Sequence, residues 1–449
     1  MHPIPSSYKD PSGFIFLQDD LYYRAIHKSY EEHYEKLMSS GLYENLVQKK
    51  LLIPHQEVAQ QEVHRVVLPQ QIWPISYAYE WSFTMWKDAA LCTLDNAIEG
   101  LKFDMMLKDA NTFNIQFVHG KPILIDTLSF ERYTEGEAWI AYMQFCTCFL
   151  GPLFLMKYTH YSAHLLLVQY PNGIPLEICN ALLPFGAKCN LHVFLHIVLP
   201  SRMQKKQASA SQKMHGMSKQ KLAHLLHGLK SCIQQLHLKK TKSTWDDYYD
   251  ATILSEHYLQ EKKDIASAML ATISFERILD MGTNKGEFAI LYQQQAKQII
   301  ATDFDANCIE SLYTCCKAKG YTNILPLIID STNPSPSIGW NNTERPSFLQ
   351  RISADITFAL ALIHHLAIAN NIPLQQIVQL FHSMSRYVLI EFVPKSDPKV
   401  KALLQYRKDI FDKYTLESFK QEVAKLFVVL QEKQITNTDR VLFLLERKP

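Results

Sequence analysis

The residues with the clearest chemical pattern form a short loop in the C-terminal half, Asp280-Met281-Gly282-Thr283-Asn284-Lys285-Gly286. The loop follows an apolar run and places one acid ahead of two glycines. Glycine allows a tight turn and lets a ligand approach the backbone closely. Enzymes that bind a dinucleotide pyrophosphate more usually present Gly-x-Gly-x-x-Gly. The acid ahead of the glycines departs from that pattern, so we expect Asp280, Gly282, Asn284 and Gly286 to form a small-ligand site of another kind.

Two more acids stand at the ends of the next apolar runs. Asp303 follows the loop by roughly 20 residues, the spacing at which an acid hydrogen-bonds ribose hydroxyls in nucleotide-binding α/β folds. Asp330 ends the following run and suits contact with an adenine amino group. Phe304 and Ser331 directly follow these two acids. We expect all four residues to contribute to cofactor binding.

Three side chains further along the chain could take part in proton transfer. His364 and His365 follow an apolar run, and Glu391 lies near the end of the next one. An imidazole titrates near neutral pH and can take a proton from an acceptor group. Each of the three residues also has a simpler interpretation, as a packing or hydrogen-bonding residue with no catalytic role.

These residues need a scaffold in which short strands alternate with helices. We expect strands at 277–280, 298–303, 324–330, 356–361, 387–392, 427–430 and 440–445, and helices at 286–296, 305–319, 373–385, 397–405 and 415–425. Such alternation is typical of an α/β domain with a doubly wound, mostly parallel sheet. Open α/β sheets bind ligands at the carboxyl ends of their strands, so the three acids are expected to meet at one edge.

The loop at 280–286, with Asp303 and Asp330, resembles the cofactor motifs of the class I, Rossmann-like S-adenosylmethionine-dependent methyltransferases. The string 362–366, Leu-Ile-His-His-Leu, resembles part of their fourth motif, and two final strands joined by a short turn match the ending of their fold. The resemblance implies S-adenosyl-L-methionine as cofactor and methylation as the reaction. It departs at Asn284, which replaces the middle glycine of the first motif. Asparagine tolerates positive φ better than other non-glycine residues.

A second group of polar residues lies in the N-terminal half. Asp109 and Asn114 are followed by Asp126 at the end of an apolar run. This spacing weakly resembles the catalytic loop and metal-binding acid of protein-kinase-like folds, in which Asp109 would orient the acceptor while Asn114 and Asp126 would hold magnesium. The glycine-rich loop and the Val-Ala-Ile-Lys strand of that family are missing. Turn-capping by the three residues is therefore the alternative.

Composition divides the chain into three parts. No acidic residue occurs between Glu177 and Asp246, a stretch that carries many lysines. We expect an accessory α+β domain at 1–200, a basic linker and helix at 201–245, and the methyltransferase domain at 246–449. In the first domain we expect a hairpin around Asp19-Asp20 and helices at 30–38, 43–50 and 88–106. Tyr248 and Tyr249 are expected to fold over the cofactor.

The overall composition restricts the class of protein. Hydrophobic residues make up 47% of the chain and the net charge is +2, which excludes wholesale disorder and does not demand a nucleic-acid partner. Nine cysteines without a Cys-x-x-Cys pair fit neither a disulfide framework nor a zinc ribbon, so we predict no metal site. The N-terminal residues lack the pattern of a signal peptide. We expect a cytoplasmic protein with no membrane partner.

The leading prediction is a methyltransferase that acts on a small-molecule acceptor through oxygen, nitrogen or carbon. One alternative is a catalytically decayed binding protein that keeps the fold. Another is a phosphotransferase seated in the N-terminal domain. Methylation of nucleic acid is a variant of the leading prediction, but the chain has no Asn-Pro-Pro-Tyr motif for a flipped base.

Overall fold

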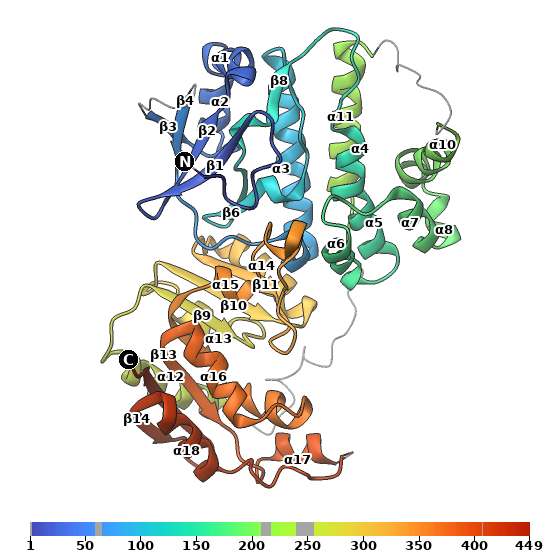
Figure 1. The fold of residues 1–449 in the computed structure, drawn as a ribbon. Helices are drawn as coiled ribbons and strands as arrows, with labels where there is room; N and C mark the ends of the chain where they lie inside the picture. The colour runs from blue at the N-terminus through green and yellow to red at the C-terminus, as the bar shows by residue number, and fades with distance from the viewer. Residues whose placement is uncertain (1, 59–64, 208–216, 239–255, 406) are drawn as a thin grey trace. The chain divides into compact units, whose positions relative to one another are not determined.

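The computed structural model describes residues 2–58, 65–207, 217–238, 256–405 and 407–449 (Figure 1). The chain forms two compact units. Unit 1 contains Met1–Lys240 and Pro336–Pro346, and unit 2 contains Thr241–Ser335 and Ser347–Pro449. The aromatic residues Tyr248 and Tyr249, expected to cover the cofactor, lie outside the described residues.

Unit 2 is built on a seven-stranded sheet with the order β11-β10-β9-β12-β13-β15-β14. Strands β9 to β13 pair in parallel, and β15 pairs antiparallel with both β13 and β14. All the predicted strands are present, which confirms the mostly parallel α/β sheet. The strands are β9 (Arg277–Met281), β10 (Gln298–Asp303), β11 (Ile324–Ile328), β12 (Ala354–Ala359), β13 (Ser385–Phe392), β14 (Phe427–Gln434) and β15 (Val441–Arg447).

Helices connect these strands and bury their apolar sides against the sheet (Figure 1). The predicted helices are found, although α13 stops short of residue 296 because Tyr292 leaves the helical region. Successive strands run outward from β9 to β11, and the chain then returns to β12 on the other side of β9. The helices are α12 (Glu256–Leu270), α13 (Glu287–Leu291), α14 (Ala306–Lys319), α15 (Phe348–Arg351), α16 (Leu374–Met384), α17 (Pro398–Leu404) and α18 (Leu416–Leu426).

Unit 1 begins with a four-stranded antiparallel sheet in the order β1-β2-β4-β3. Its first two strands form the predicted hairpin, in which Asp19 and Asp20 have φ of 49° and 59°. Two consecutive left-handed residues are what a tight hairpin turn requires. The elements are β1 (Gly13–Gln18), β2 (Leu21–Ile26), α1 (Glu31–Ser39), α2 (Leu42–Gln48), β3 (His55–Val58) and β4 (Arg65–Pro69).

The next element is the long helix α3 (Phe83–Lys102). The prediction that it extends to Met106 is wrong, because Asp104 takes a positive φ of 56° and the chain enters a strand, β5 (Met105–Leu107). Strand β5 pairs antiparallel with β8 (Phe130–Arg132). Between them lies the hairpin of β6 (Ile115–Val118) and β7 (Lys121–Leu124).

Between residues 142 and 234, the described part of unit 1 is mostly helical. The π-helical turn η5 (Cys146–Leu150) joins α4 to α5, and a second one, η7 (Phe194–Val198), joins α9 to α10. Most of the apolar stretch 140–156 is buried in helix pieces, as predicted. The helices are α4 (Tyr142–Phe145), α5 (Gly151–Tyr158), α6 (Leu166–Gln169), α7 (Leu176–Leu182), α8 (Phe185–Lys188), α9 (Leu191–Val193), α10 (Leu199–Gln207) and α11 (Lys219–Gln234).

The segment Pro336–Pro346 belongs to unit 1, although unit 2 flanks it on both sides in the sequence. Ile338 and Arg345 close it by exchanging two backbone hydrogen bonds of 3.1 Å. The Arg345 guanidinium lies 4.1 Å from the centroid of the Phe113 ring, and Glu344 forms an ion pair with Lys9. A cation over an aromatic face is attracted to it. The segment therefore completes unit 1.

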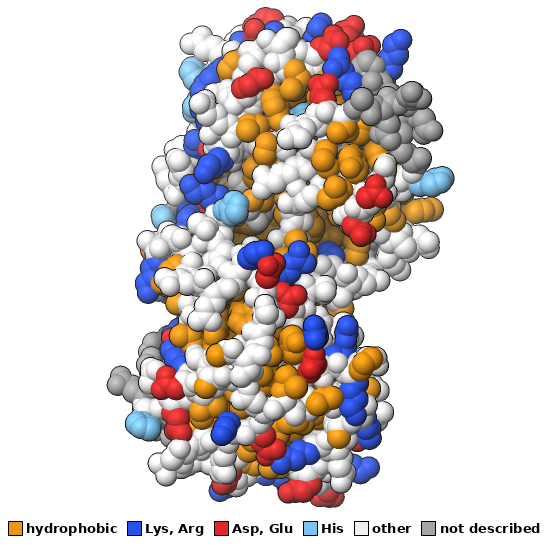
Figure 2. All heavy atoms as spheres, turned by 90° about the vertical axis from the view of Figure 1, so that its left-hand side faces the viewer, with side chains coloured by type: hydrophobic (Ala, Val, Ile, Leu, Met, Phe, Trp, Pro, Cys, Tyr) orange, Lys and Arg blue, Asp and Glu red, His pale blue; other side chains and the backbone are white. Residues whose placement is uncertain are grey.

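On the face shown in Figure 2, side chains of both charge signs are interspersed with apolar ones, as the near-neutral net charge implies. In the part of the chain that the structure describes, no helix is long and apolar enough to cross a bilayer.

Candidate functional site

A cavity of about 290 Å³ opens at the carboxyl ends of the central strands of unit 2. Strand β9 lies where the direction of the chain across the sheet reverses, and ligands of open α/β sheets bind at such switch points. The walls come from the loops after β9, β10, β11 and β12. The lining residues are Gly282, Asn284, Asp303, Phe304, Ile329, Asp330, Ser331, Thr332, Leu360, Ala361, Leu362, His365, Leu366, Ala369 and Asn370.

The loop after β9 is fixed by its own backbone. The N–H groups of Gly282 and Thr283 both donate to the Thr302 carbonyl oxygen, at 2.8 and 2.9 Å. Gly282, Asn284 and Gly286 have φ of 71°, 51° and 85°. Asn284 thus adopts the left-handed conformation that a glycine would supply, because asparagine tolerates it. The replacement of the middle glycine therefore keeps the left-handed turn, and Asn284 itself lines the cavity.

Two of the three predicted acids lie against this loop. Asp303 accepts hydrogen bonds from the backbone N–H groups of Asn284 and Asp305, both at 2.9 Å, and it lines the cavity. Asp280 is buried beneath the loop and accepts a 2.6 Å hydrogen bond from the Thr283 hydroxyl. Burial raises the pKa of each carboxyl to about 6, because the charged form is poorly solvated there. Of the two, only Asp303 lines the cavity.

The third acid, Asp330, lies at the rim of the cavity. It accepts hydrogen bonds from the backbone N–H and the hydroxyl of Thr332, at 2.8 and 2.7 Å. Phe304, 56% exposed, and Ser331 line the cavity beside it. Gly286 is the last residue of the loop, and a Cβ atom there would come within 2.4 Å of Leu312 Cδ1. Gly286 therefore supports the loop by close packing and does not line the cavity.

The two adjacent histidines differ in position. His365 lines the cavity, and burial together with Lys399 and Arg440 lowers its pKa to about 4. His364 is fully buried, and neither of its ring nitrogens has a hydrogen-bond partner within the described ranges. Burial keeps the pKa of His364 well below its usual value. The imidazole rings have centroids 4.1 Å apart, and both are neutral at physiological pH.

Glu391 does not line the cavity. Its carboxylate lies 2.6 Å from Lys262 Nζ, accepts a 2.6 Å hydrogen bond from the Tyr258 hydroxyl and lies 3.3 Å from Arg440. Burial alone would raise the pKa of Glu391, but Lys262 and Arg440 lower it to about 2. Arg440 also forms an ion pair with Asp397 at 2.7 Å. We call Tyr258, Lys262, Glu391, Asp397 and Arg440 the buried ion cluster.

The structure adds one feature that the sequence did not suggest. Ala361, directly after β12, has a positive φ of 52° and lines the cavity. Non-glycine residues pay a steric cost in this region, and such residues gather at functional sites. Together with Leu360, Leu362 and Leu366, Ala361 forms an apolar wall of the cavity. No glycine or other signal marks position 361 in the sequence.

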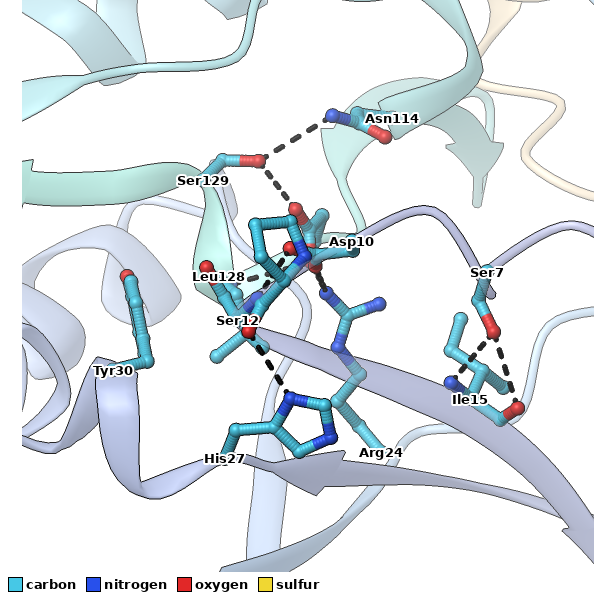
Figure 3. A network of polar contacts seen from close by, with 12 residues as sticks. Ser7, Asp10, Ser12, Ile15, Arg24, His27, Tyr30, Asn114, Leu128 and Ser129 are labelled. Carbon is cyan, nitrogen blue, oxygen red and sulfur yellow. Dashed lines mark hydrogen bonds and ion pairs between the residues drawn. The ribbon is translucent and has the colours of Figure 1, made fainter. Parts of the chain in front are cut away.

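The polar residues Asp109, Asn114 and Asp126 of the N-terminal half also come together, in unit 1. Figure 3 shows Asn114 and Ser129 of this network beside Arg24 and Asp10. Asp126 lies 2.9 Å from Arg24 and accepts a 2.6 Å hydrogen bond from Ser129, which in turn contacts Asn114 at 3.4 Å. Arg24 forms a further ion pair with Asp10. Both carboxylate oxygens of Asp126 are thus engaged by protein groups, one of them by a cation where the kinase-like resemblance would place magnesium.

Asp109 is the third residue of that group. Its carboxylate accepts hydrogen bonds from Gln144 Nε2 at 2.7 Å and from the Asn111 backbone at 3.1 Å. Burial and the nearby Asp126 raise its pKa. These contacts are those of residues that cap turns and hold loops. The kinase-like resemblance stays a prediction.

The strand order of unit 2, the glycine loop after its first strand and the acids after the next two strands together define the class I, Rossmann-like methyltransferase fold. Over 459 aligned residues, the whole chain is 30% identical to nodulation protein NoeA of Rhizobium meliloti (strain 1021), and the match covers 99% of this chain and 96% of NoeA. The chain belongs to the family of that protein. No protein-family model matches the chain.

Solved methyltransferases are similar to part of the chain. The N-methyltransferase NodS from Bradyrhizobium japonicum WM9, in complex with S-adenosyl-L-homocysteine, is 10% identical with a TM-score of 0.35, covering 45% of this chain and 93% of NodS. The magnesium protoporphyrin IX methyltransferase ChlM from Synechocystis PCC 6803 is 11% identical with a TM-score of 0.31, covering 48% of this chain and 89% of ChlM. These scores are low, and the fold assignment rests on the strand order.

Proposed function

We propose that this protein is an S-adenosyl-L-methionine-dependent methyltransferase that acts on a small-molecule acceptor. One observation carries the proposal. A single cavity at the switch point of the sheet joins the left-handed loop after β9 to the acids after β10 and β11. This arrangement suits an adenosyl cofactor with a cationic sulfur, because the ribose hydroxyls and the adenine amino group donate hydrogen bonds to carboxylates and the positive charge is attracted to them.

The residues present fit the cofactor. Gly282 has no side chain to block the cavity, where a Cβ atom would lie 3.2 Å from Leu362 Cδ1. The carboxylate of Asp303 would accept hydrogen bonds from the ribose hydroxyls, and that of Asp330 would accept one from the adenine amino group. Phe304 and Ser331 would contact the adenosine beside them. When bound, the cofactor supplies an already activated methyl group, so the protein has to orient the acceptor and exclude water.

We propose His365 as the residue that takes a proton from the acceptor. It is the titratable residue of the predicted catalytic set that lines the cavity, and its neutral form can accept a proton. His364 and Glu391, also predicted as catalytic, lie behind the cavity wall. We assign them positioning roles, with His364 packed on His365 and Glu391 neutralising Lys262. A concave cavity with a largely apolar wall is typical of a small-molecule site, which supports a small-molecule acceptor.

The test is calorimetric titration of the full chain with S-adenosylmethionine and S-adenosylhomocysteine. We expect micromolar binding of both by the wild-type protein and no detectable binding by the Asp303→Ala variant. Asp264→Ala, which removes an exposed acid of α12, is the matched control and should bind as the wild type does.

Either of two results would overturn the proposal. Wild-type affinity in a folded Asp303→Ala protein would show that the cofactor binds elsewhere or not through this acid. Failure of the folded wild-type protein to bind either ligand would favour the alternative of a decayed enzyme that keeps the fold as a binding module. The predicted cytoplasmic location stays a prediction.

A further inference from the structure

The helix that spans residues 191–207 in unit 1 has an exposed apolar stripe. It is continuous through α9, the π-helical turn η7 and α10. The exposed side chains recur at the spacing of one helical face. The buried side chains of the opposite face are those of Val193, Ile197, Val198 and Ser201. The exposed members are Leu191 at 66%, Phe194 at 39%, Leu195 at 40%, Leu199 at 39% and Met203 at 49%.

The preceding helices extend this surface. Phe185 in α8 is 83% exposed and Leu182 in α7 is 50% exposed. In Figure 1, α7, α8 and α10 lie together at one edge of unit 1. Isolated exposed apolar residues are normal in folded proteins, but a group of this kind marks a surface that binds something. We call Leu182, Phe185 and the exposed side chains of the 191–207 helix the apolar edge.

The stretch of sequence that carries the apolar edge is basic, although α7 has the exposed acid Glu177 in its first turn. Between Glu177 and Asp246 the chain has no acidic residue and carries eleven lysines and arginines. The half-buried Lys188 lies in α8, and the exposed Arg202 lies in α10 next to Met203. A basic, apolar helix face matches a surface that is negatively charged outside and apolar just beneath.

From this match we propose that the apolar edge binds the surface of a membrane that contains anionic phospholipid. The 191–207 helix would lie in the plane of the interface, with its stripe among the acyl chains and its cations among the headgroups. The helix is ~25 Å long, too short to span the ~30 Å hydrocarbon core, so it binds at the surface without crossing. The sequence alone predicted no membrane partner, since exposure of these side chains is visible only in the fold.

The experiment is co-sedimentation of the full chain with vesicles of phosphatidylcholine alone or of equal parts phosphatidylcholine and phosphatidylglycerol. We expect binding to the mixed vesicles that weakens in high salt and on omission of phosphatidylglycerol. Phe185→Ser combined with Leu191→Ser should lower the partition coefficient by ~100-fold, about tenfold or ~1.4 kcal/mol for each side chain. Ile410→Ser, which removes a 62% exposed side chain of unit 2, should leave it unchanged.

Two outcomes would overturn the proposal. The first is equal sedimentation of the wild-type protein with and without mixed vesicles. The second is a dimer, seen by size-exclusion chromatography with light scattering, that the Phe185 and Leu191 substitutions abolish, since the edge would then be occupied by a second copy of the chain. Circular dichroism of each variant shows that it is folded. Because no cofactor enters these assays, their result is independent of the proposed methyltransferase activity.

Discussion

Replacing Glu391 with glutamine separates a structural role from a catalytic one. The substitution removes one of the two carboxylates of the buried ion cluster and leaves Lys262, which is 2% exposed, without its partner at 2.6 Å. Leaving one member of a buried ion pair uncompensated costs ~3–5 kcal/mol of unfolding free energy. For a domain of this size, 1 kcal/mol corresponds to ~2–4 °C, so we expect Tm to fall by ~6–20 °C.

Two measurements on the full chain report this loss. Thermal unfolding gives Tm, and hydrogen exchange of peptides from β13 and β15 shows whether the loss lies in unit 2, because Glu391 is part of β13 and Arg440 precedes β15. Removing the cation as well, in the Lys262→Met and Glu391→Gln double variant, should restore several degrees.

Lys263, the residue after Lys262, provides the matched control for loss of an ion pair. Lys263 forms an ion pair of the same 2.6 Å length with Glu287, but both side chains are partly exposed. Lys263→Met should therefore cost ~0–1 kcal/mol. A fall in Tm of about 2 °C corresponds to ~1 kcal/mol or less. If Glu391→Gln lowers Tm by no more than this and still abolishes methyl transfer, the structural assignment of Glu391 is refuted.

The remaining predictions concern the cofactor loop, its acid and the histidine of the cavity. Gly286→Ala should lower unfolding stability by ~1–3 kcal/mol, because the residue has a φ of 85° and its Cβ would clash with Leu312. Gly320→Ala, at positive φ but in open space, should cost only ~1 kcal/mol, and equal Tm losses in the two variants would contradict the packing argument. Calorimetry should show that cofactor affinity falls about tenfold for each pH unit below about 6. Asp303 has a pKa of about 6, and its protonation removes the form that accepts hydrogen bonds from the ribose hydroxyls. A cofactor affinity that stays constant between about pH 5 and 7 would exclude this role. His365→Asn should lower kcat by ~10²–10⁴-fold with unchanged cofactor affinity. At saturating cofactor, the acidic limb of the wild-type kcat profile should fall near pH 4, and a limb near the usual histidine pKa of about 6.5 would show that another group takes the proton.

The sheet of unit 2 could be predicted because its strands are short apolar runs that end in acids and glycines. Asp303 and Asp330 were found at the cavity because the carboxyl ends of parallel strands share one edge of the sheet. The sequence did not show which of the adjacent residues His364 and His365 lines the cavity. Only the fold shows that the two are consecutive residues of one helical segment whose side chains differ in place, so that His365 lines the cavity and His364 is buried.

Other features depend on contacts between residues far apart in the sequence. Tyr258 and Glu391 are separated by 133 positions, and Arg440 follows much later, so no local pattern marked the buried ion cluster or predicted that Glu391 would be fully engaged. The strand β5 was hidden because Met105 and Met106 continue the apolar spacing of α3. Their pairing with β8 overrides that local preference.

The segment Pro336–Pro346 has a consequence for how the protein is synthesised. Unit 1 receives this last piece only after the first strands of unit 2 have been translated, so it cannot complete its fold while residue 240 leaves the ribosome. Until then Phe113 and Lys9 lack their partners Arg345 and Glu344. A gene fragment that ends at residue 240 would encode an incomplete body, and one that starts at 241 would carry a segment with nothing to pack against. We therefore expect the two units to fold completely only within one chain, so that neither can be exchanged as a separate domain.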